Sequence, residues 1–387
     1  MNQDLPQPLT LIATARFGLE ALVKREVEAL GFSDLRVSDG RVEFEAALED
    51  IPRLNIWLRF AGRLLLKIGE FPATTFDALF EGVKNLPWER WITPDGRFSV
   101  NARSVKSTLQ SERTSQAIVK KAVVERLKDA YSVDWFAETG PEFTIQVSVR
   151  KDQALLTIDT SGAGLHKRGY RTEAGEAPLK ETLAAAMVQL SFWDGGRLLV
   201  DPMCGSGTIL IEAAMIARNI APGLKESFAS EEWPAIPPAA WASARAQAEA
   251  AIDHSGELQI FGYDVDAEAI AVARNNARRA GVGDDILFEV KDIHELWIDQ
   301  QYGILISNPP YGRRMAEYRE INAIYITLNK MLRKKKGWSV YILTADSKFP
   351  DYFKRGHPNR VRKLYNGTIR VNYYQYYGEK QPDSDTA

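Results

Sequence analysis

A glycine-rich turn between an apolar run and a helical segment restricts the fold of this chain more than any other feature. Leu198 to Val200 has the composition of a buried strand, and an apolar helical pattern runs from Ile209 to Ala217. The turn from Asp201 to Thr208 contains Gly205 and Gly207, which take backbone angles that other residues avoid. This pattern predicts the first strand, turn and helix of a parallel α/β sheet, with a ligand bound at the turn.

The residues around this turn favour an adenosine over a phosphate group. A phosphate-binding loop ends in Gly-Lys-Ser/Thr, whereas Thr208 is followed by isoleucine. Asp264 closes the apolar segment Leu258 to Tyr263, and Asp292 follows Ile286 to Val290. An acidic residue at the end of a second strand binds ribose hydroxyls, and a carboxylate after the third strand can accept adenine amino hydrogens. The set predicts a site for S-adenosyl-L-methionine.

A rigid tetrad later in the chain supplies the predicted chemistry. Asn308, Pro309, Pro310 and Tyr311 follow the apolar segment Gly303 to Ser307. The two prolines fix φ and remove two backbone donors, so the loop presents hydrogen-bond acceptors. The Asn308 side-chain oxygen and the Pro309 carbonyl can each accept one N–H from the exocyclic amine of guanine or adenine, which favours a nucleophilic nitrogen. Tyr311 can then stack on the base, and the reaction requires no catalytic His or Cys.

These motifs together resemble those of a known family. The segments Gly164 to Arg171, Glu176 to Ala185, Asp201 to Thr208 and Asn308 to Gly312 resemble the bacterial 23S ribosomal-RNA guanine-N2 methyltransferases that carry an N-terminal THUMP domain. The resemblance spans nearly the whole chain. Some members continue into a second methyltransferase domain, and this sequence stops soon after its first. The resemblance therefore implies a single methylation activity.

The resemblance also implies roles for individual residues. Asn308, Pro309 and Tyr311 are expected at the target amine. Donor binding is expected at Asp201, Cys204, Gly205, Gly207, Thr208, Asp264 and Asp292. The implied cofactor is S-adenosyl-L-methionine, and no metal is expected. The implied partner is RNA, either 23S rRNA or a large-subunit assembly intermediate.

The order of the apolar patterns predicts three domains and a tail. Residues 1–70 have the order βαββαβ of an α+β ferredoxin-like domain. Residues 71–163 follow the order of an RNA-binding THUMP domain. Residues 164–380 alternate helices and strands like an α/β class I (Rossmann-like) methyltransferase domain, and they end in an antiparallel hairpin. Residues 381–387 are polar and predict a disordered tail.

Local charge indicates where RNA would be held. The net charge of −2 does not indicate RNA binding, but the segment from Arg97 to Lys128 contains eight basic residues and only two acidic ones. A helix predicted there would bury Ala117, Ile118, Ala122, Val123 and Leu127. The glycine-flanked segment His166 to Arg171 combines cations with an aromatic ring. Predicted RNA contacts are Arg113, Lys120, Lys121, Lys167, Arg168 and Arg171. A solvated helix face and a plain linker are the alternatives.

The cysteine content and the N-terminal sequence favour a cytoplasmic enzyme. Cys204 is the only cysteine, which excludes an intramolecular disulfide or a Cys-based zinc cluster. Within the donor turn it is expected to pack rather than to attack, which argues against C5 methylation of pyrimidines. No basic and apolar signal segment begins the chain, and no stretch approaches the ~20 apolar residues that span a membrane.

Three other functions stay open from the sequence. THUMP proteins with this type of tetrad include tRNA guanine-N2 methyltransferases, and the motifs do not separate the two substrates. Adenine N6 also fits the tetrad, although the extended match from Gly164 to Ala185 argues against it. A non-catalytic RNA-binding or ribosome-assembly protein would not need the acidic residues and the asparagine of the two motifs. Trp233 and Trp241 either line a target-base pocket or pack a lid against the body.

Overall fold

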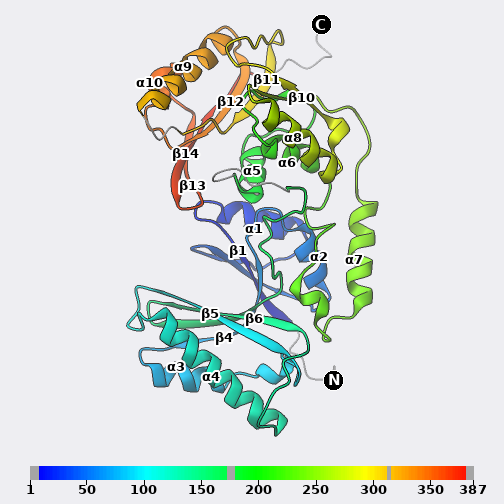
Figure 1. The fold of residues 1–387 in the computed structure, drawn as a ribbon, viewed down its shortest axis with the longest axis vertical. Helices are drawn as coiled ribbons and strands as arrows, with labels where there is room; N and C mark the ends of the chain where they lie inside the picture. Colours follow the sequence, from blue (N-terminus) through cyan, green and yellow to red (C-terminus); the bar gives the residue numbers. More distant parts are fainter. Residues whose placement is uncertain (1–7, 172–178, 312–314, 381–387) are drawn as a thin grey trace. The chain divides into compact units, whose positions relative to one another are not determined.

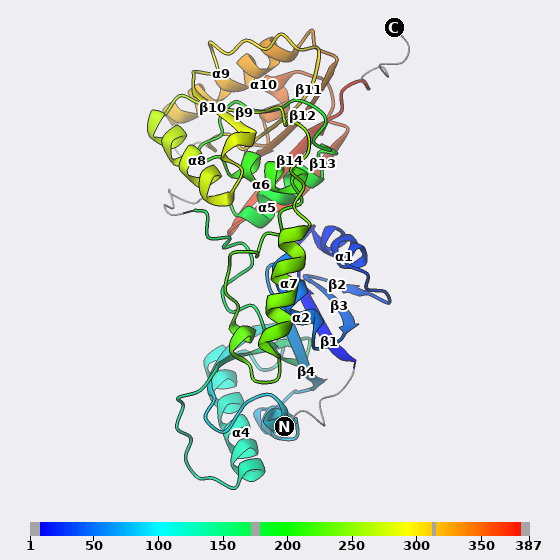
Figure 2. The same cartoon turned by 90° about the vertical axis from the view of Figure 1, so that its right-hand side faces the viewer.

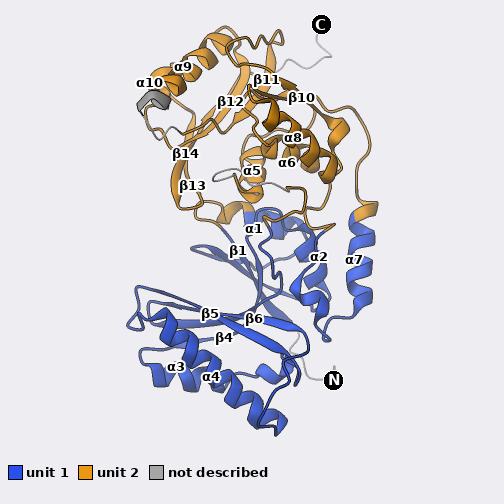
Figure 3. Cartoon of the chain, viewed as in Figure 1, with its two compact units in different colours: residues 1–15, 23–165, 226–248 blue, residues 16–22, 166–225, 249–387 orange. Residues whose placement is uncertain are grey.

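The computed structural model describes residues 8–171, 179–311 and 315–380, without the side chains of 315–318. The predicted tail and part of the segment 176–185 therefore lie outside the described residues. The chain, drawn in Figure 1, forms two compact units, which are coloured separately in Figure 3. The amino-terminal unit comprises residues 1–15, 23–165 and 226–248, and the carboxy-terminal unit comprises 16–22, 166–225 and 249–387. The chain thus passes between the units five times, after residues 15, 22, 165, 225 and 248.

The first half of the amino-terminal unit has the predicted ferredoxin-like order. Its elements are β1 (Leu9–Thr14), α1 (Glu20–Ala29, which the unit boundary divides), β2 (Arg36–Ser38), β3 (Arg41–Ala46), α2 (Asp50–Trp57) and β4 (Leu64–Pro72). β1 pairs antiparallel with β3 and β4, and Figure 2 shows β2, β3 and β1 side by side. Leu11, Ile12 and Ala13 are all buried, so β1 is covered on both faces.

The second half adds three strands to the same sheet. Its elements are α3 (Phe76–Lys84), the 3-10 turn η1 (Trp88–Arg90), β5 (Arg97–Val105), α4 (Glu112–Tyr131), β6 (Glu142–Arg150) and β7 (Gln153–Asp159). β6 and β7 form the predicted hairpin, and β7 also pairs with β4. One seven-stranded sheet results, in the order β2-β3-β1-β4-β7-β6-β5. The domain boundary predicted after residue 70 falls inside β4, which both halves share.

Helix α4 buries a different stripe from the predicted one. Ser111 caps the helix by accepting the Thr114 N–H at 3.2 Å. The buried residues are Ser115, Val119, Ala122, Val123 and Leu127. Ala117 is exposed, so the sequence-based assignment was wrong for this residue, and Ile118 is half-buried. Residues three and four positions apart on a helix share one face, which links Ser115, Val119, Ala122, Val123 and Leu127 into one stripe. Ile118 lies at the edge of this stripe, and Ala117 lies on the other side of the helix.

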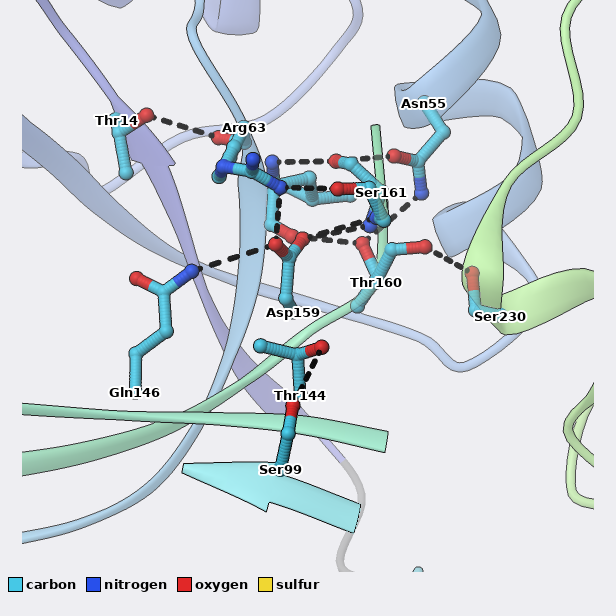
Figure 4. A network of polar contacts seen from close by, with 12 residues as sticks. Thr14, Asn55, Arg63, Ser99, Thr144, Gln146, Asp159, Thr160, Ser161 and Ser230 are labelled. Atoms are coloured by element: carbon cyan, nitrogen blue, oxygen red, sulfur yellow. Dashed lines mark hydrogen bonds and ion pairs between the residues drawn. The ribbon is translucent and has the colours of Figure 1, made fainter. Parts of the chain in front are cut away.

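A buried polar network joins the two halves of this unit (Figure 4). Asp159, at the end of β7, forms an ion pair with Arg63 and accepts the Ser161 N–H at 2.9 Å. Asn55 of α2 donates to Thr160 Oγ1 at 3.0 Å and accepts the Ser161 hydroxyl at 2.8 Å. Burial raises the pKa of Asp159, and the Arg63 charge acts against that rise. Because Asn55, Asp159, Thr160 and Ser161 are buried and bonded to one another, the network fixes α2, β4 and β7 together.

The segment 226–248 returns to this unit from the middle of the chain. It contains η2 (Ala229–Glu232) and most of α7 (Pro238–Ala250). The N–H and the hydroxyl of Ser230 both donate to the Thr160 carbonyl, at 3.1 and 2.8 Å (Figure 4). Trp233 stacks on Phe143 at 5.2 Å between ring centroids, and Trp241 stacks on Phe228 at 5.4 Å. Both tryptophans are buried. Trp233 packs this segment onto β6, whereas the Trp241 stacking lies within the segment itself.

The carboxy-terminal unit contains a second seven-stranded sheet, in the order β10-β9-β8-β11-β12-β14-β13. Its strands are β8 (Leu199–Asp201), β9 (Ile260–Asp264), β10 (Ile286–Val290), β11 (Tyr302–Ser307), β12 (Gly337–Thr344), β13 (Arg360–Asn366) and β14 (Ile369–Tyr376). The first five strands in the sheet are parallel, and β13 and β14 form the predicted antiparallel hairpin. This arrangement confirms the predicted Rossmann-like fold.

Helices cover both faces of this sheet (Figure 1). They are α5 (Glu181–Gln189), α6 (Thr208–Ala217), α8 (Ala267–Ala280), α9 (Met315–Leu332) and α10 (Phe349–Phe353), with a 3-10 turn η3 (Gly283–Asp285). α5, α6 and α8 lie on one face, and α9 and α10 lie on the other. The core between the sheet and α9 contains Val200, Leu305 and Tyr325. Since β8, β9, β10 and β11 are parallel, their carboxyl ends share one edge, with the order reversing between β8 and β11.

Candidate active site

The turn after β8 has the geometry of a ligand-binding glycine loop. Gly205 and Gly207 have φ angles of +52° and +79°, which favour glycine. A Cβ added at Gly205 would meet no atom within 4 Å, so this side of the turn is open. A Cβ at Gly207 would lie 2.9 Å from the Phe288 ring. One glycine therefore leaves room for a ligand, and the other lets the loop pack against β10.

Two carboxylates lie at the strand ends beside this turn. Asp264 ends β9, and its Oδ2 and Oδ1 accept the N–H groups of Gly205 and Asp266 at 2.9 and 3.0 Å. Each oxygen keeps a second lone pair for a ribose hydroxyl. Asp292 follows β10, which pairs in parallel with β9, and its Oδ1 accepts the His294 N–H at 2.8 Å. Parallel strands end together, so both acidic residues lie at the edge where we expected them.

Two exposed valines beside these carboxylates were missed by the sequence analysis. Val265 follows Asp264 directly and is 69% exposed, and Val290 at the end of β10 is 52% exposed. An exposed apolar side chain beside hydrogen-bonding groups suits the flat face of an adenine ring. The sequence gives no signal that separates these valines from the core residues of the same strands. Together with the open turn, they fit the adenosine of S-adenosyl-L-methionine.

Asp201 is buried and supports the turn from behind. Its Oδ1 accepts the Ser307 hydroxyl at 2.7 Å and the Met203 N–H at 3.1 Å. Burial raises the pKa of Asp201 to about 7, the two hydrogen bonds act against this rise, and the Asp264 charge adds to it. The Asp201 carboxylate is therefore engaged by the turn and by the residue before the tetrad. The Ser307 bond also joins the two sequence motifs, because β8 and β11 are neighbours.

We expect the pKa of Asp201 to make stability depend on pH. Its folded pKa of about 7 lies above the ordinary aspartate value of 3.8, so the stabilisation is complete below about pH 4 and is lost as the pH rises through 7. Relative to Asp201→Asn, the free energy of unfolding of the wild type should fall by roughly 1.5 kcal/mol from about pH 5.5 to about pH 7. Urea unfolding of both proteins at each pH measures this. Parallel pH profiles would contradict the assignment.

Cys204 and Thr208 are buried parts of the same turn. Burial raises the pKa of the Cys204 thiol well above its ordinary value, which does not suit a nucleophile. Thr208 begins α6, and its Oγ1 accepts from Arg171 at 2.5 Å and lies 3.2 Å from Ser206 Oγ. Arg171 also pairs with Glu181 at 3.4 Å. The charge of Arg171 is therefore engaged beside the donor turn rather than presented to RNA.

The tetrad follows β11, and two of its side chains bond to each other. Tyr311 Oη donates to Asn308 Oδ1 at 2.6 Å, and Pro309 is buried. Burial raises the pKa of Tyr311 to about 12, while a hydrogen bond with the Asn366 side chain lowers it. Asn366 is buried at the end of β13, and the sequence analysis missed it because it lies far from the tetrad in the chain. The Asn308 side-chain oxygen thus already accepts one hydrogen bond and keeps a second lone pair.

Arg168 is the second predicted RNA contact that the structure contradicts. The Arg168 side chain is fully buried, and its Nε lies 3.1 Å from the Glu212 carboxylate. Turning Arg168 towards solvent would leave a buried carboxylate uncompensated, which is costly. Tyr170 Oη donates to the same carboxylate at 3.0 Å. These contacts make the segment structural, although the neighbouring Lys167 is exposed as predicted.

The predicted contacts on α4 are all exposed. Arg113, Lys120 and Lys121 lie outside the buried stripe of the helix. The Lys120 ammonium lies over the Phe98 ring at 6.0 Å, and that of Lys121 lies over the Phe80 ring at 5.7 Å. Both lysines therefore rest partly on aromatic surface, which holds their charges near the helix.

Comparison with known proteins identifies the family. The sequence profile described as the RMKL-like methyltransferase domain matches residues 168–375. The chain belongs to the RMKL-like methyltransferase family. Two further profiles match this RMKL-like methyltransferase, namely the RlmL ferredoxin-like domain at residues 10–65 and the THUMP domain at 73–159. The resemblance drawn from the motifs, and the predicted domain types, are thereby confirmed.

Several relatives match over nearly the whole chain. The putative RNA methyltransferase YpsC of Bacillus subtilis is 44% identical and covers 96% of this chain and 97% of its own length. The ribosomal RNA large subunit methyltransferase K/L of Syntrophotalea carbinolica is 36% identical over 95% of this chain, which spans about half (53%) of that relative. A crystal structure of a predicted N6-adenine-specific DNA methylase from Listeria monocytogenes has a TM-score of 0.92 and 45% identity, covering 96% and 97% of the two chains.

The solved relatives also bear on the cofactor. The putative methyltransferase SMU.472, solved in complex with SAH, has a TM-score of 0.92 and 42% identity, covering 97% of this chain and all (100%) of its own. Class I methyltransferases take the methyl group from S-adenosyl-L-methionine, which is thus the cofactor of this RMKL-like methyltransferase. Among the residues that the structure describes, no helix is long and apolar enough to cross a membrane.

Proposed function

We propose that this protein methylates the exocyclic N2 amine of one guanine in 23S ribosomal RNA. The observation that carries the proposal is the adjacency of the two motifs. Ser307, directly before the tetrad, donates its hydroxyl to Asp201, the first residue of the donor turn, at 2.7 Å. The acceptors of the tetrad are thereby held at the strand end beside the donor turn. Neighbouring parallel strands are where this fold builds its sites.

The tetrad acts by positioning an amine. The lone pair of an exocyclic amine is delocalised into the base, so acceptors on its N–H groups must draw that density back onto nitrogen. The Asn308 side-chain oxygen and the Pro309 carbonyl are the proposed acceptors, and Tyr311 is the proposed stacking partner. Bound S-adenosyl-L-methionine supplies the methyl group from its sulfonium. The amine nitrogen loses one proton to water afterwards, so positioning carries most of the rate.

The donor contacts of the proposal come from the glycine turn and the acidic strand ends. Gly205, Gly207 and Asp264 shape the ribose side, and Asp292 and Val265 lie on the adenine side. Asp201, Cys204 and Thr208 support the turn from within. In this proposal the buried residues act on affinity through the shape of the turn, whereas the partly exposed ones touch the donor.

RNA as the substrate rests on the THUMP match and on the names of the relatives. The target guanine must be unpaired or extruded to reach Asn308, which costs a few kcal/mol, and contacts elsewhere on the RNA offset that cost. The expected partner is 23S rRNA or a large-subunit assembly intermediate, and the expected location is the cytoplasm. The domain limits 1–70, 71–163 and 164–380 belong to the same proposal.

Two rival substrates share this site. A tRNA guanine would use the same acceptors. The name of the Listeria relative favours an adenine N6 amine, which offers the same two N–H groups to the tetrad. A binding-only protein is the third rival. It would keep RNA contacts without needing Asn308 or Asp264.

Nucleoside mass spectrometry separates these possibilities. We expect cells that lack the protein to lose N2-methylguanosine from their 23S rRNA, and a plasmid copy to restore it. A copy carrying Asn308→Ala is the control, because it should be present at normal amounts and restore nothing. Loss from tRNA, or loss of N6-methyladenosine, would replace the proposed substrate by the corresponding rival. Full restoration by the Asn308→Ala copy would support the binding-only protein.

A further inference from the structure

One end of the amino-terminal sheet carries a group of basic residues that the methyl transfer does not use. β5 and β6 are parallel, with Val105 paired to Arg150, so both strands end at the same place. The Lys151 N–H donates to the Val105 carbonyl at 3.3 Å and joins the two ends. We call the basic residues around this point the sheet-end cluster: Arg103, Lys106, Arg113, Arg150 and Lys151.

The sheet-end cluster is exposed, and few carboxylates compensate it. All five side chains are exposed. Arg150 pairs with Asp39 at 2.6 Å, and the hydrogen bond and charge of Arg150 lower the pKa of Asp39. Within the part of the chain that the structure describes, Arg103, Lys106, Arg113 and Lys151 have no carboxylate oxygen within 4.0 Å of their nitrogens. Most of the positive charge is therefore open to a partner.

The nearby acidic residues fix the loops instead. Glu112 accepts the Ser104 N–H at 3.1 Å, which holds the start of α4, with Arg113, against the end of β5. Asp152 accepts the Ser107 hydroxyl at 2.8 Å and the Thr108 N–H at 2.7 Å. The loop after β5 is thereby tied to the turn after β6. The backbone that carries the cationic side chains is therefore held in place before RNA binds, which lowers the entropic cost of binding.

The sheet face that continues from the cluster is polar and uncharged. Arg103 is paired with Ser148, and the next pair towards the strand starts is Asn101 with Gln146. Ser99 follows, paired with Thr144. These side chains alternate with the buried residues of β5 and β6, and α4 packs against the other side of β5. Hydroxyl and amide groups in rows beside cations suit phosphate oxygens and sugar hydroxyls.

We propose that the sheet-end cluster is the surface on which the amino-terminal unit holds the phosphates of the substrate RNA. The inference rests on the proposed function, because it takes RNA as the substrate. It also moves the main RNA contact away from Lys120 and Lys121, whose charges lie over aromatic rings. Arg113 belongs to both sets, since it lies at the start of α4 beside the loop.

The test compares two full-length variants that each lose basic side chains of this unit. One carries Lys106→Gln, Arg113→Gln and Lys151→Gln, and its control carries Lys120→Gln and Lys121→Gln. The affinity of the wild type and of each variant for large-subunit rRNA, taken from cells that lack the protein, is measured in filter-binding assays from about 0.05 to about 0.2 M KCl. We expect the triple variant to bind about tenfold more weakly near 0.15 M, with a salt slope smaller by about 2. The control should stay within about twofold.

The outcomes separate the surface from the proposed function. Calorimetric titration with S-adenosyl-L-methionine should give the same Kd for all three proteins, which shows that the carboxy-terminal unit is intact. Unchanged RNA binding by the triple variant, with normal binding by the wild type, would overturn the sheet-end cluster and leave the methylation proposal untouched. A loss confined to the Lys120 and Lys121 variant would return the contact to the middle of α4. A wild type without salt-dependent RNA binding would overturn the RNA substrate itself.

Discussion

Replacing Asn308 by alanine should lower kcat about 100-fold or more, with donor affinity nearly unchanged. The change removes one of the two proposed acceptors for the target amine. It leaves the glycine turn and Asp264 in place, because Asn308 makes its side-chain bond to Tyr311 rather than to the donor loop. Single-turnover methylation of rRNA with radiolabelled donor measures the rate, and calorimetry measures the donor Kd.

Tyr311→Phe is the matched variant for this prediction. Its ring remains, but the hydroxyl that occupies the Asn308 oxygen at 2.6 Å is removed. If that oxygen accepts the target amine, the phenylalanine variant should keep its kcat within a few-fold of the wild type. A loss in Tyr311→Phe as large as that in Asn308→Ala would show that the bonded pair acts as a unit. Normal turnover by Asn308→Ala would remove the tetrad from the mechanism.

Replacing Asp264 by alanine should weaken donor binding about 30-fold or more. Hydrogen bonds to a charged group contribute about 2 kcal/mol each, and that energy corresponds to a factor of about 30 in Kd. The variant would also lose the bond to the Gly205 N–H at 2.9 Å, which fixes the turn. Asp264→Asn keeps an oxygen for that N–H, so its Kd should lie between those of the wild type and the alanine variant.

Asp266 provides the control, because it lies two residues away and has a different task. It caps α8 by accepting the Glu268 N–H at 2.8 Å. Asp266→Ala should therefore cost about 1 kcal/mol of stability and leave the donor Kd within a few-fold. Calorimetric titration and thermal unfolding of the three variants give both numbers. An Asp264→Ala protein that binds the donor normally would contradict the pocket assignment.

The arrangement around the donor was predictable because each motif ends a strand. Asp201, Asp264 and Asp292 follow consecutive apolar runs, and parallel strands bring their ends to one edge. The same logic placed Asn308 near the turn, since β11 lies beside β8. What local sequence could not show is the second partner of each group. The Ser307 bond to Asp201 and the Asn366 contact with Tyr311 join residues far apart in the chain.

The failures also have a physical cause. Arg168 was predicted to contact RNA because its neighbours are cationic and glycine-flanked, but a carboxylate of α6 pairs with it in the interior. Ala117 was expected inside α4, although the longer apolar stripe runs through Val119 and Leu127. The pairing of β4 with β7 could not be predicted either, because it joins segments that lie far apart in the chain. Each of these depends on contacts between distant segments, which periodicity does not encode.

Because residues 226–248 belong to the amino-terminal unit, that unit cannot complete its folding early in the synthesis of the chain. Chains emerge from the N-terminus, and domains generally fold as units while synthesis continues. The partners of Phe143 and of the Thr160 carbonyl are Trp233 and Ser230, which are synthesised only after the donor turn. The amino-terminal unit is thus completed by a piece of chain that the ribosome delivers after part of the carboxy-terminal unit. A nascent chain stalled before residue 226 would expose the Phe143 ring to solvent and to chaperones.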